Sequence, residues 1–184
     1  MDYYKDESII IRDIKESDVV ELFSWWTDKK LNQFDPKTMP QNSEDLLKEC
    51  ELFCKRFDQE IISKSRYIYF IICDKDNFPI GFVNVFDIDK MSLECELGII
   101  IGDKIYHGKG IAKRALEVVT HYVFTVLGMK CIRIETAKDN LPAVNLFRKS
   151  GFVKTSEEHE DNMEFLVMKK FRQEIINAGA SSTQ

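Results

Sequence analysis

The sequence predicts a single α+β domain (α/β-like) built on a mixed central sheet. Three observations support this fold class: short β-branched or alternating apolar runs recur along the chain, longer segments between them carry apolar residues at helical spacing, and a glycine-rich turn joins a strand to a long helix. With 184 residues, 44% of them hydrophobic, one domain can bury a core without metals or disulfides. The expected order is a strand, two helices, three strands, a helix, a strand, a helix and two strands.

The first third of the chain predicts one strand and two helices. A strand is expected at 9–11, and Ser17 with Asp18 starts a helix as cap and acidic first turn. Two prolines make 27–42 irregular, and a second helix starts at 43–45. The faces expected to be buried are Val19, Leu22, Phe23 and Trp26 on the first helix, and Leu46, Cys50, Phe53, Phe57 and Ile61 on the second.

Strands dominate the middle of the chain. Residues 67–73 are aromatic and β-branched, and a turn cluster at 74–79 leads to a second such run at 80–86, which predicts a hairpin. A third strand is expected at 93–101. There, apolar residues from Leu93 onward alternate with a set that contains Glu96.

The last third alternates helices and strands. A long helix follows the glycine turn and ends near Gly128, a strand covers 130–136, and a helix with Pro142 in its first turn stops at Gly151. Two strands, near 152–156 and at 163–171, complete the sheet. We therefore expect one domain over 1–171 and a loosely ordered tail over 172–184.

The net charge and the hydropathy of the chain argue against a nucleic-acid-binding protein and a membrane protein. A net charge of −5 gives no general attraction to nucleic acids or anionic membranes, and it suits a cationic substrate. The amino-terminal residues are polar, and no apolar run approaches the roughly 18 residues of a membrane span. These features predict a cytoplasmic protein with neither a nucleic-acid nor a membrane partner.

The cysteines predict neither disulfides nor a metal site. They are five in number, well separated and without a CxxC pair, and the chain has only three histidines. We interpret them as reduced thiols, mostly in the core.

The turn at 107–112, His-Gly-Lys-Gly-Ile-Ala, has the composition of an anion-binding loop. Gly108 and Gly110 let the main chain turn sharply, and the amides of the following helix start carry positive partial charge. The turn lacks the Gly-Lys-Ser/Thr of a nucleotide triphosphate loop and the third glycine of a dinucleotide loop. Taken alone, two glycines at this spacing more often mark an ordinary strand-to-helix turn.

The neighbours of this turn resemble the acetyl-CoA core of the GNAT superfamily of N-acetyltransferases. That family combines a strand of the form E-[IL]-G, the turn motif, a long helix, a strand, and then N-x-x-A-x-x-L-[YF]-x-K-x-G-F. Here the motifs are Glu96-Leu97-Gly98, His107 to Ala112, and Asn140 to Phe152. The amino-terminal part, with Asp18 and Trp26-Thr27-Asp28, resembles the branch that acetylates ribosomal-protein amino termini and its relatives that acetylate spermidine or amino sugars.

The resemblance implies a fold and a way of holding acetyl-CoA. The sheet would have about seven mostly antiparallel strands with helices on both faces, and the strands at 93–101 and 130–136 would splay around the thioester. The pyrophosphate would contact the main chain of 107–112, and the pantetheine arm would lie along 99–101. The implied cofactor-binding residues are Ile99, Ile100, Ile101, His107, Gly108, Lys109, Gly110, Ile111, Ala112, Lys113, Asn140, Phe147 and Lys149. For the lysines, solvated surface charge is an equal alternative.

The resemblance also implies direct acetyl transfer to a primary amine of a small molecule, amino sugar, polyamine or peptide amino terminus. Glu96 is the candidate base, and a carboxylate paired with a nearby cation or helix end is an equal alternative for it. A backbone N–H at Ile99 or Ile100 is the candidate oxyanion donor. Many family members carry a tyrosine as general acid where this chain has Phe147. Asn140, water, Tyr106 or Tyr122 remain as candidates. Edge strands of this fold often pair between subunits, which is compatible with a homodimer, but the sequence leaves the oligomeric state open.

Two other functions fit the same residues. The absent tyrosine is compatible with a non-catalytic acetyl-CoA sensor or scaffold, and the glycine turn by itself is compatible with another phosphate ligand.

Overall fold

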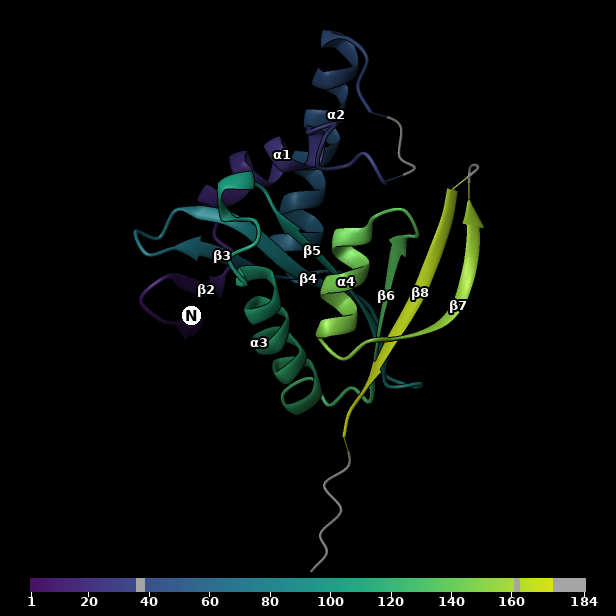
Figure 1. Cartoon of the computed structure of the whole chain (residues 1–184). Helices are drawn as coiled ribbons and strands as arrows, with labels where there is room; N and C mark the ends of the chain where they lie inside the picture. Colours follow the sequence, from purple (N-terminus) through teal and green to yellow (C-terminus); the bar gives the residue numbers. More distant parts are fainter. Residues whose placement is uncertain (36–38, 161–162, 174–184) are drawn as a thin grey trace, which may run out of the picture.

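The computed structural model describes residues 1–35, 39–160 and 163–173. Eight strands of this part form one open sheet in the order β1-β2-β3-β4-β5-β6-β8-β7 (Figure 1). All neighbouring strands are antiparallel except β5 and β6, which are parallel. The predicted mixed, mostly antiparallel sheet is confirmed. The strands are β1 (Asp2–Lys5), β2 (Ile9–Asp13), β3 (Ile68–Asp74), β4 (Pro79–Asp89), β5 (Glu94–Ile101), β6 (Cys131–Ala137), β7 (Val153–Glu160) and β8 (Met163–Phe171).

Helices cover both faces of the sheet (Figure 1). Helices α1 (Val19–Thr27) and α2 (Ser43–Arg56) pack on one face, in a cluster that contains Leu22 and Phe53. Helices α3 (Ile111–Thr125) and α4 (Leu141–Lys149) pack on the other, in a larger cluster that contains Leu116 and Phe147. Short helical segments follow or precede them at Glu16–Asp18, Phe57–Ile62 and Lys104–Tyr106.

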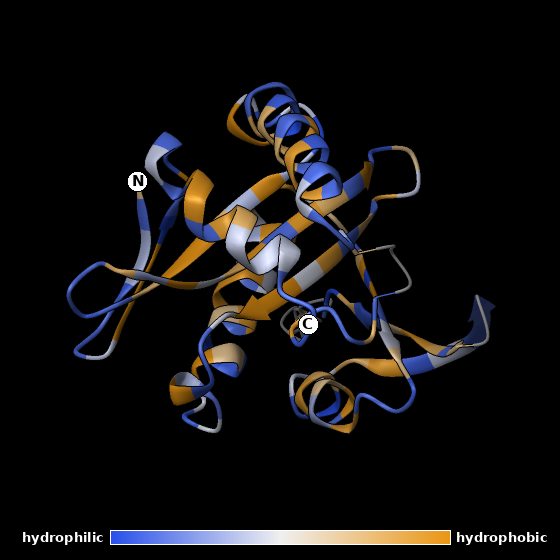
Figure 2. Cartoon of the chain, turned by 90° about the horizontal axis from the view of Figure 1, so that it is seen from above, coloured by the Kyte–Doolittle hydropathy of each residue, from blue (hydrophilic) through white to orange (hydrophobic). Residues whose placement is uncertain are grey.

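The core therefore lies in two layers, one on each side of the sheet. Alternate residues of a central strand enter different layers: Phe70 and Ile72 of β3 belong to the α3 side, whereas Ile71 and Cys73 belong to the α1 side. Figure 2 shows the hydrophobic strands at the centre and hydrophilic positions on the outer faces of the helices. The described part of the chain has no helix long and apolar enough to cross a membrane.

The sheet has one strand more than the about seven that we expected. Strand β1, in the polar start of the chain, adds an eighth strand at the edge. Its main chain pairs with β2, from Asp2 opposite Arg12 to Lys5 opposite Ile10. Tyr3 also packs on Phe70 of the core, with ring centroids 4.8 Å apart. Backbone pairing and the packing of Tyr3 and Tyr4 against the larger core cluster hold this strand at the sheet edge.

The predicted tail at 172–184 lies outside the described residues from position 174 onward.

Candidate active site

A fork between β5 and β6 forms the centre of the site. The two strands pair over only three positions, of which the last is Glu96 opposite Arg133. Beyond it, β5 stays paired with β4 as far as Ile101 opposite Gly81, and β6 stays paired with β8 as far as Ala137 opposite Phe165. The edge of β5 that faces β6 therefore has no strand partner after Glu96. This is the divergence that the sequence resemblance implies.

The open edge of β5 consists of half-buried isoleucines. Ile99 and Ile101 pack against the larger core on the α3 side, and Ile100 packs against the cluster under α1 and α2. On the side that faces β6, the main-chain N–H and C=O groups of these residues form an unpaired sheet edge. Such an edge can accept an extended, peptide-like arm as an additional strand.

The open edge leads directly to the glycine turn. Gly108 and Gly110 have φ values of 73° and 76°, a conformation that other residues rarely adopt. A Cβ atom built at either glycine would have nothing within 4 Å in the described chain, so both positions face open space. The turn thus presents bare main chain at the start of α3.

The first turn of α3 is not capped by a side chain and contains no acidic residue. Arg114 N–H donates to the Gly110 carbonyl at 3.1 Å, whereas the N–H groups of Ile111, Ala112 and Lys113 precede the first intrahelical bonds. Their partial charges and the helix dipole favour an anion at this point. The geometry is that of a phosphate cradle.

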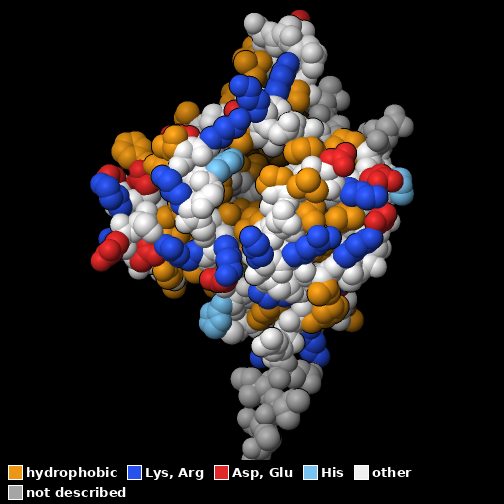
Figure 3. All heavy atoms as spheres, viewed as in Figure 1, with side chains coloured by type: hydrophobic (Ala, Val, Ile, Leu, Met, Phe, Trp, Pro, Cys, Tyr) orange, Lys and Arg blue, Asp and Glu red, His pale blue; other side chains and the backbone are white. Residues whose placement is uncertain are grey.

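Lys109 and Lys113 lie on either side of the start of α3 in the sequence, and Lys149 is the last residue of α4. Lys109, Lys113 and Lys149 are exposed. The Lys109 ammonium lies 5.6 Å from the centroid of the Tyr106 ring, and Lys113 pairs with Glu117 at 3.6 Å. Figure 3 shows a band of Lys and Arg side chains across the face that carries α3 and α4. This charge suits the outer phosphates of a nucleotide.

The His107 side chain contacts the end of β5. It is exposed, and its Nε2 lies 3.0 Å from the carbonyl oxygen of Ile101. The imidazole therefore ties the turn back to the end of β5.

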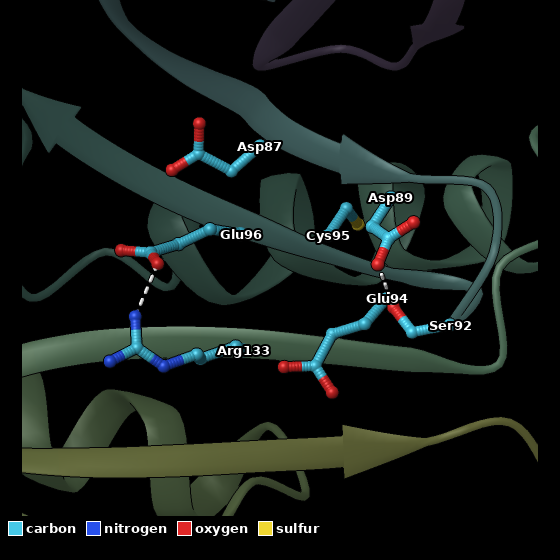
Figure 4. Close-up of a pocket in the computed structure, with 7 residues that line it drawn as sticks. All are labelled: Asp87, Asp89, Ser92, Glu94, Cys95, Glu96 and Arg133. Atoms are coloured by element: carbon cyan, nitrogen blue, oxygen red, sulfur yellow. Dashed lines mark hydrogen bonds and ion pairs between the residues drawn. The ribbon is translucent and has the colours of Figure 1, made fainter.

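Glu96 lies at the fork in an ion pair with Arg133 (Figure 4). The Arg133 Nη1 donates to the Glu96 carboxylate at 2.5 Å, and the same guanidinium contacts Glu135 and Glu158. Burial raises the pKa of Glu96, the Arg133 charge lowers it, and the charges of Glu135 and Asp87 raise it. The net shift is upward, which moves this carboxyl toward the range of a useful base.

An acidic cavity of about 280 Å³ opens beside this ion pair. Four carboxylates and one guanidinium line it, so its local charge is negative. Glu94 is already paired with Lys169 at 2.8 Å, and Asp89 accepts from the Ser92 hydroxyl at 2.7 Å. The lining residues are Asp87, Asp89, Ser92, Glu94, Cys95, Glu96 and Arg133 (Figure 4).

The thiol in the cavity lining, Cys95, is not an activated nucleophile. Burial raises the pKa of the Cys95 thiol to about 12, so it stays protonated at neutral pH. In the described part of the chain, no cluster of His, Cys, Asp and Glu is arranged to hold a metal ion. The geometry is compatible with direct transfer to an acceptor.

Asn140 caps α4 at the end of β6. Its side-chain oxygen accepts the N–H of Ala143 at 3.3 Å, and the residue is half-buried. Phe147, in contrast, is only 5% exposed and packs on Phe152 with ring centroids 5.8 Å apart. The structure places Asn140 at an opening of the sheet and Phe147 in the core.

The two tyrosines considered as acids are engaged elsewhere. The Tyr106 hydroxyl donates to Asp74 at 3.2 Å, and burial together with this carboxylate raises its pKa. Tyr122 packs edge-on against Tyr3 and Phe70, under the β1 side of the sheet. Neither hydroxyl is positioned at the fork by these contacts.

Sequence reasoning missed Arg133, Asp87 and Asp89. The alternation of Ile132 and Ile134 with charged residues indicates that Arg133 lies on the opposite strand face, away from the main core. It does not give the strand register that sets Arg133 opposite Glu96.

Comparison with known proteins identifies relatives of this arrangement. A family model described as an acetyltransferase (GNAT) domain matches residues 8–153. The spermidine N(1)-acetyltransferase of Escherichia coli K12 is 32% identical over 119 residues, which cover 65% of this chain and 61% of that protein. The matched part is thus less than two thirds of the relative's length.

Solved structures share the fold. A spermidine N-acetyltransferase from Vibrio cholerae, in complex with CoA and spermine, superposes with a TM-score of 0.74 at 23% identity, covering 90% of this chain and 96% of that one. A ribosomal-protein-S5-alanine acetyltransferase from Vibrio fischeri gives a TM-score of 0.71 at 21% identity, covering 93% and 96%.

Proposed function

Because the chain belongs to the acetyltransferase (GNAT) domain family, we propose that it transfers the acetyl group of acetyl-CoA to a primary amine. One structural observation carries the proposal: the unpartnered edge of β5 runs from Glu96 at the fork to the glycine turn at the start of α3. A phosphate cradle and a carboxylate are thereby joined by a strand edge that fits an extended arm.

The residues present fit acetyl-CoA. The pyrophosphate would contact the main chain of 107–112, where the glycines face open space. The pantetheine arm would pair with the edge formed by Ile99, Ile100 and Ile101. Lys109, Lys113 and Lys149 are exposed and would meet the outer phosphates.

When bound, acetyl-CoA supplies an acetyl thioester whose C–S bond breaks as the acceptor nitrogen bonds to the carbonyl carbon, giving an N-acetyl amine and CoA thiol. The Glu96 carboxylate would take the proton that the acceptor ammonium must lose, directly or through water. A main-chain N–H at Ile99 or Ile100 would stabilise charge on the carbonyl oxygen. Asn140 would orient the sulfur end, and the thiolate, with an ordinary pKa of about 8.5, can leave without a strong acid.

We propose a cationic acceptor of the diamine or polyamine type. The cavity next to Glu96 is lined by four carboxylates, of which Asp87 and Asp89 form no ion pair with another described residue. A second ammonium group of the acceptor would be attracted there. The name of the Escherichia coli relative agrees with this class of acceptor.

The experiment is a CoA-release assay with acetyl-CoA and a panel of amines: spermidine, spermine, a short diamine, a matched monoamine, an amino sugar and a peptide with a free amino terminus. We expect turnover with polyamines, weaker turnover with the monoamine, and loss of most turnover in Glu96→Gln with acetyl-CoA affinity retained. A monoamine that matches spermidine would contradict the acceptor class. Saturable acetyl-CoA binding without turnover on any amine would contradict acetyl transfer.

A second candidate, a non-catalytic acetyl-CoA sensor, is favoured by the burial of Phe147 and by the engagement of Tyr106 with Asp74. Calorimetry with acetyl-CoA, CoA, ATP and NAD, run beside the turnover assay, separates it from the enzyme and from a nucleotide-binding protein.

A further inference from the structure

We propose that Arg133 is a positioning residue of the acetyl-transfer site, which fixes the Glu96 carboxylate at the fork and keeps it charged until an acceptor amine arrives. This inference rests on the proposed function, since it assigns a task to the surroundings of the proposed base. It concerns a residue that the sequence motifs do not include.

The register of the sheet brings the two residues together. Glu96 and Arg133 face each other as the last parallel pair before β5 and β6 separate. Their neighbours Cys95, Leu97, Ile132 and Ile134 are buried in the core on the α3 side, so both charged side chains project from the other face. The ion pair, with Arg133 Nη1 2.5 Å from Glu96 Oε2, thus lies at the last paired position of β5 and β6, where the unpaired edge of β5 begins.

Arg133 is itself held from several strands. Its guanidinium contacts Glu135 on its own strand and Glu158 on β7, at 3.2 Å, besides Glu96 on β5. Planar, multiply bonded guanidinium groups hold a fixed orientation better than a lysine ammonium does. With 24% of its side chain exposed, Arg133 is shielded from much of the solvent.

The charges that face Glu96 are otherwise acidic. Asp87 and Asp89 of β4, Glu94 of β5, Glu135 of β6 and Glu158 of β7 all lie around the cavity or around Arg133. Lys169 of β8 is a further cation near the cavity, and it is bonded to Glu94. Among the described residues, Arg133 is therefore the cation in direct contact with Glu96.

Removal of the Arg133 charge should raise the pKa of Glu96. Burial and the neighbouring carboxylates raise the pKa of Glu96, whereas Arg133 lowers it. Without Arg133 the Glu96 pKa rises further, so the carboxylate loses its charge at a higher pH and the acidic limb of kcat/KM moves to higher pH.

The test compares pH profiles of kcat/KM for the wild type, Arg133→Gln and Arg133→Lys. In Arg133→Gln we expect the acidic limb at higher pH and kcat/KM about tenfold or more lower on that limb, because a positioned general base contributes about 10²–10⁴-fold. Arg133→Lys should return the limb toward the wild-type position while kcat stays reduced. The matched control is Lys169→Gln, which breaks an ion pair of similar exposure on the same sheet, between β5 and β8.

Two results would overturn the inference: an acidic limb that stays in place in Arg133→Gln while kcat falls at every pH, or an equal shift in Lys169→Gln. Circular dichroism and thermal unfolding show whether each variant is folded, and Arg133→Lys keeps the test available if Arg133→Gln is not.

A second measurement needs no turnover. Carbon-13 NMR titration of the side-chain carboxyl of Glu96, assigned with Glu96→Gln, reports its ionisation in the wild type and in Arg133→Lys or Arg133→Gln. A midpoint that does not move in the variants contradicts the role of Arg133. A wild type that releases no CoA contradicts the proposed function instead, so the two failures are distinguishable.

Discussion

Gly102 lies against the indole ring of Trp25. A Cβ atom added to Gly102 would be 2.1 Å from the indole Nε1, and Trp25 is a buried residue of α1. Gly102 directly follows β5, and its N–H donates to the Ile80 carbonyl at 2.8 Å. The contact therefore fixes α1, on the face of the sheet opposite α3, against the strand end that leads to the glycine turn.

We expect Gly102→Ala to destabilise the protein, because a buried indole cannot move away as a flexible side-chain tip can. The cost should be about 1–3 kcal/mol, as for other overpacked sites, measured by urea unfolding. Gly98→Ala is the control: its Cβ would meet the Asn84 side-chain oxygen at 2.6 Å, and that amide can rotate. Equal losses in the two variants would contradict the proposed rigidity of the Trp25 contact.

The buried ion pair between Arg12 and Asp18 fixes the start of α1 on β2. Both side chains are at most 5% exposed, and two hydrogen bonds of 2.8 Å join them. Asp18→Ala leaves the guanidinium buried without its carboxylate, so we expect a loss of about 3–5 kcal/mol of unfolding free energy. The double variant Arg12→Met with Asp18→Leu should recover most of this loss. A single variant as stable as the wild type in denaturant titration would refute this account.

Asp6 should make stability depend on pH. Its carboxylate accepts the N–H groups of Ser8 and Ile9 and the Tyr4 hydroxyl, and it pairs with Arg114 of α3. The backbone bonds, first of all, hold the Asp6 pKa well below its ordinary value of 3.8. A carboxyl with a depressed pKa stabilises the fold above the unfolded-state pKa, and this contribution is lost as the pH falls toward the folded-state pKa.

Urea unfolding of wild type and Asp6→Asn at a series of pH values tests this expectation. The variant should be less stable near neutral pH, and the difference should shrink below pH about 4. Glu7→Gln, at an exposed neighbour, should show no such trend. A difference that stays constant down to acidic pH would assign the role of Asp6 to something other than its charge.

The backbone geometry at the proposed cofactor side of the site was predictable because its signals are local. The glycine turn, the start of α3 and the cap at Asn140 each lie within a few residues of sequence, and their backbone geometry follows from residue type. The acceptor side depends on pairing between distant segments. Arg133 meets Glu96 across 37 positions, and only the strand register makes them partners.

The buried face of α1 was also only partly predictable from the sequence. We expected Trp26 on the buried face of the first helix, yet the buried residues of α1 are Leu22 and Trp25. Val19, Phe23 and Trp26 pack partly buried against the same cluster, so the apolar face is centred one position before Trp26. Trp26 is half-buried instead, and its indole N–H donates to Glu49 of α2.

Gly110 and Gly128 offer a direct test of the phosphate cradle. They precede and follow α3, have φ values of 76° and 72°, and would both place a Cβ in open space. Alanine at either position carries the same left-handed strain of about 1–2 kcal/mol, but only the Cβ at 110 stands beside the uncapped amides of the first turn. Calorimetry should show acetyl-CoA binding weakened about tenfold or more, equivalent to about 1.4 kcal/mol, in Gly110→Ala and unchanged in Gly128→Ala. Similar thermal stability of the two variants would show that the strain is matched. Equal affinities would place the pyrophosphate away from this turn, since the two substitutions differ only in which end of the helix they occupy.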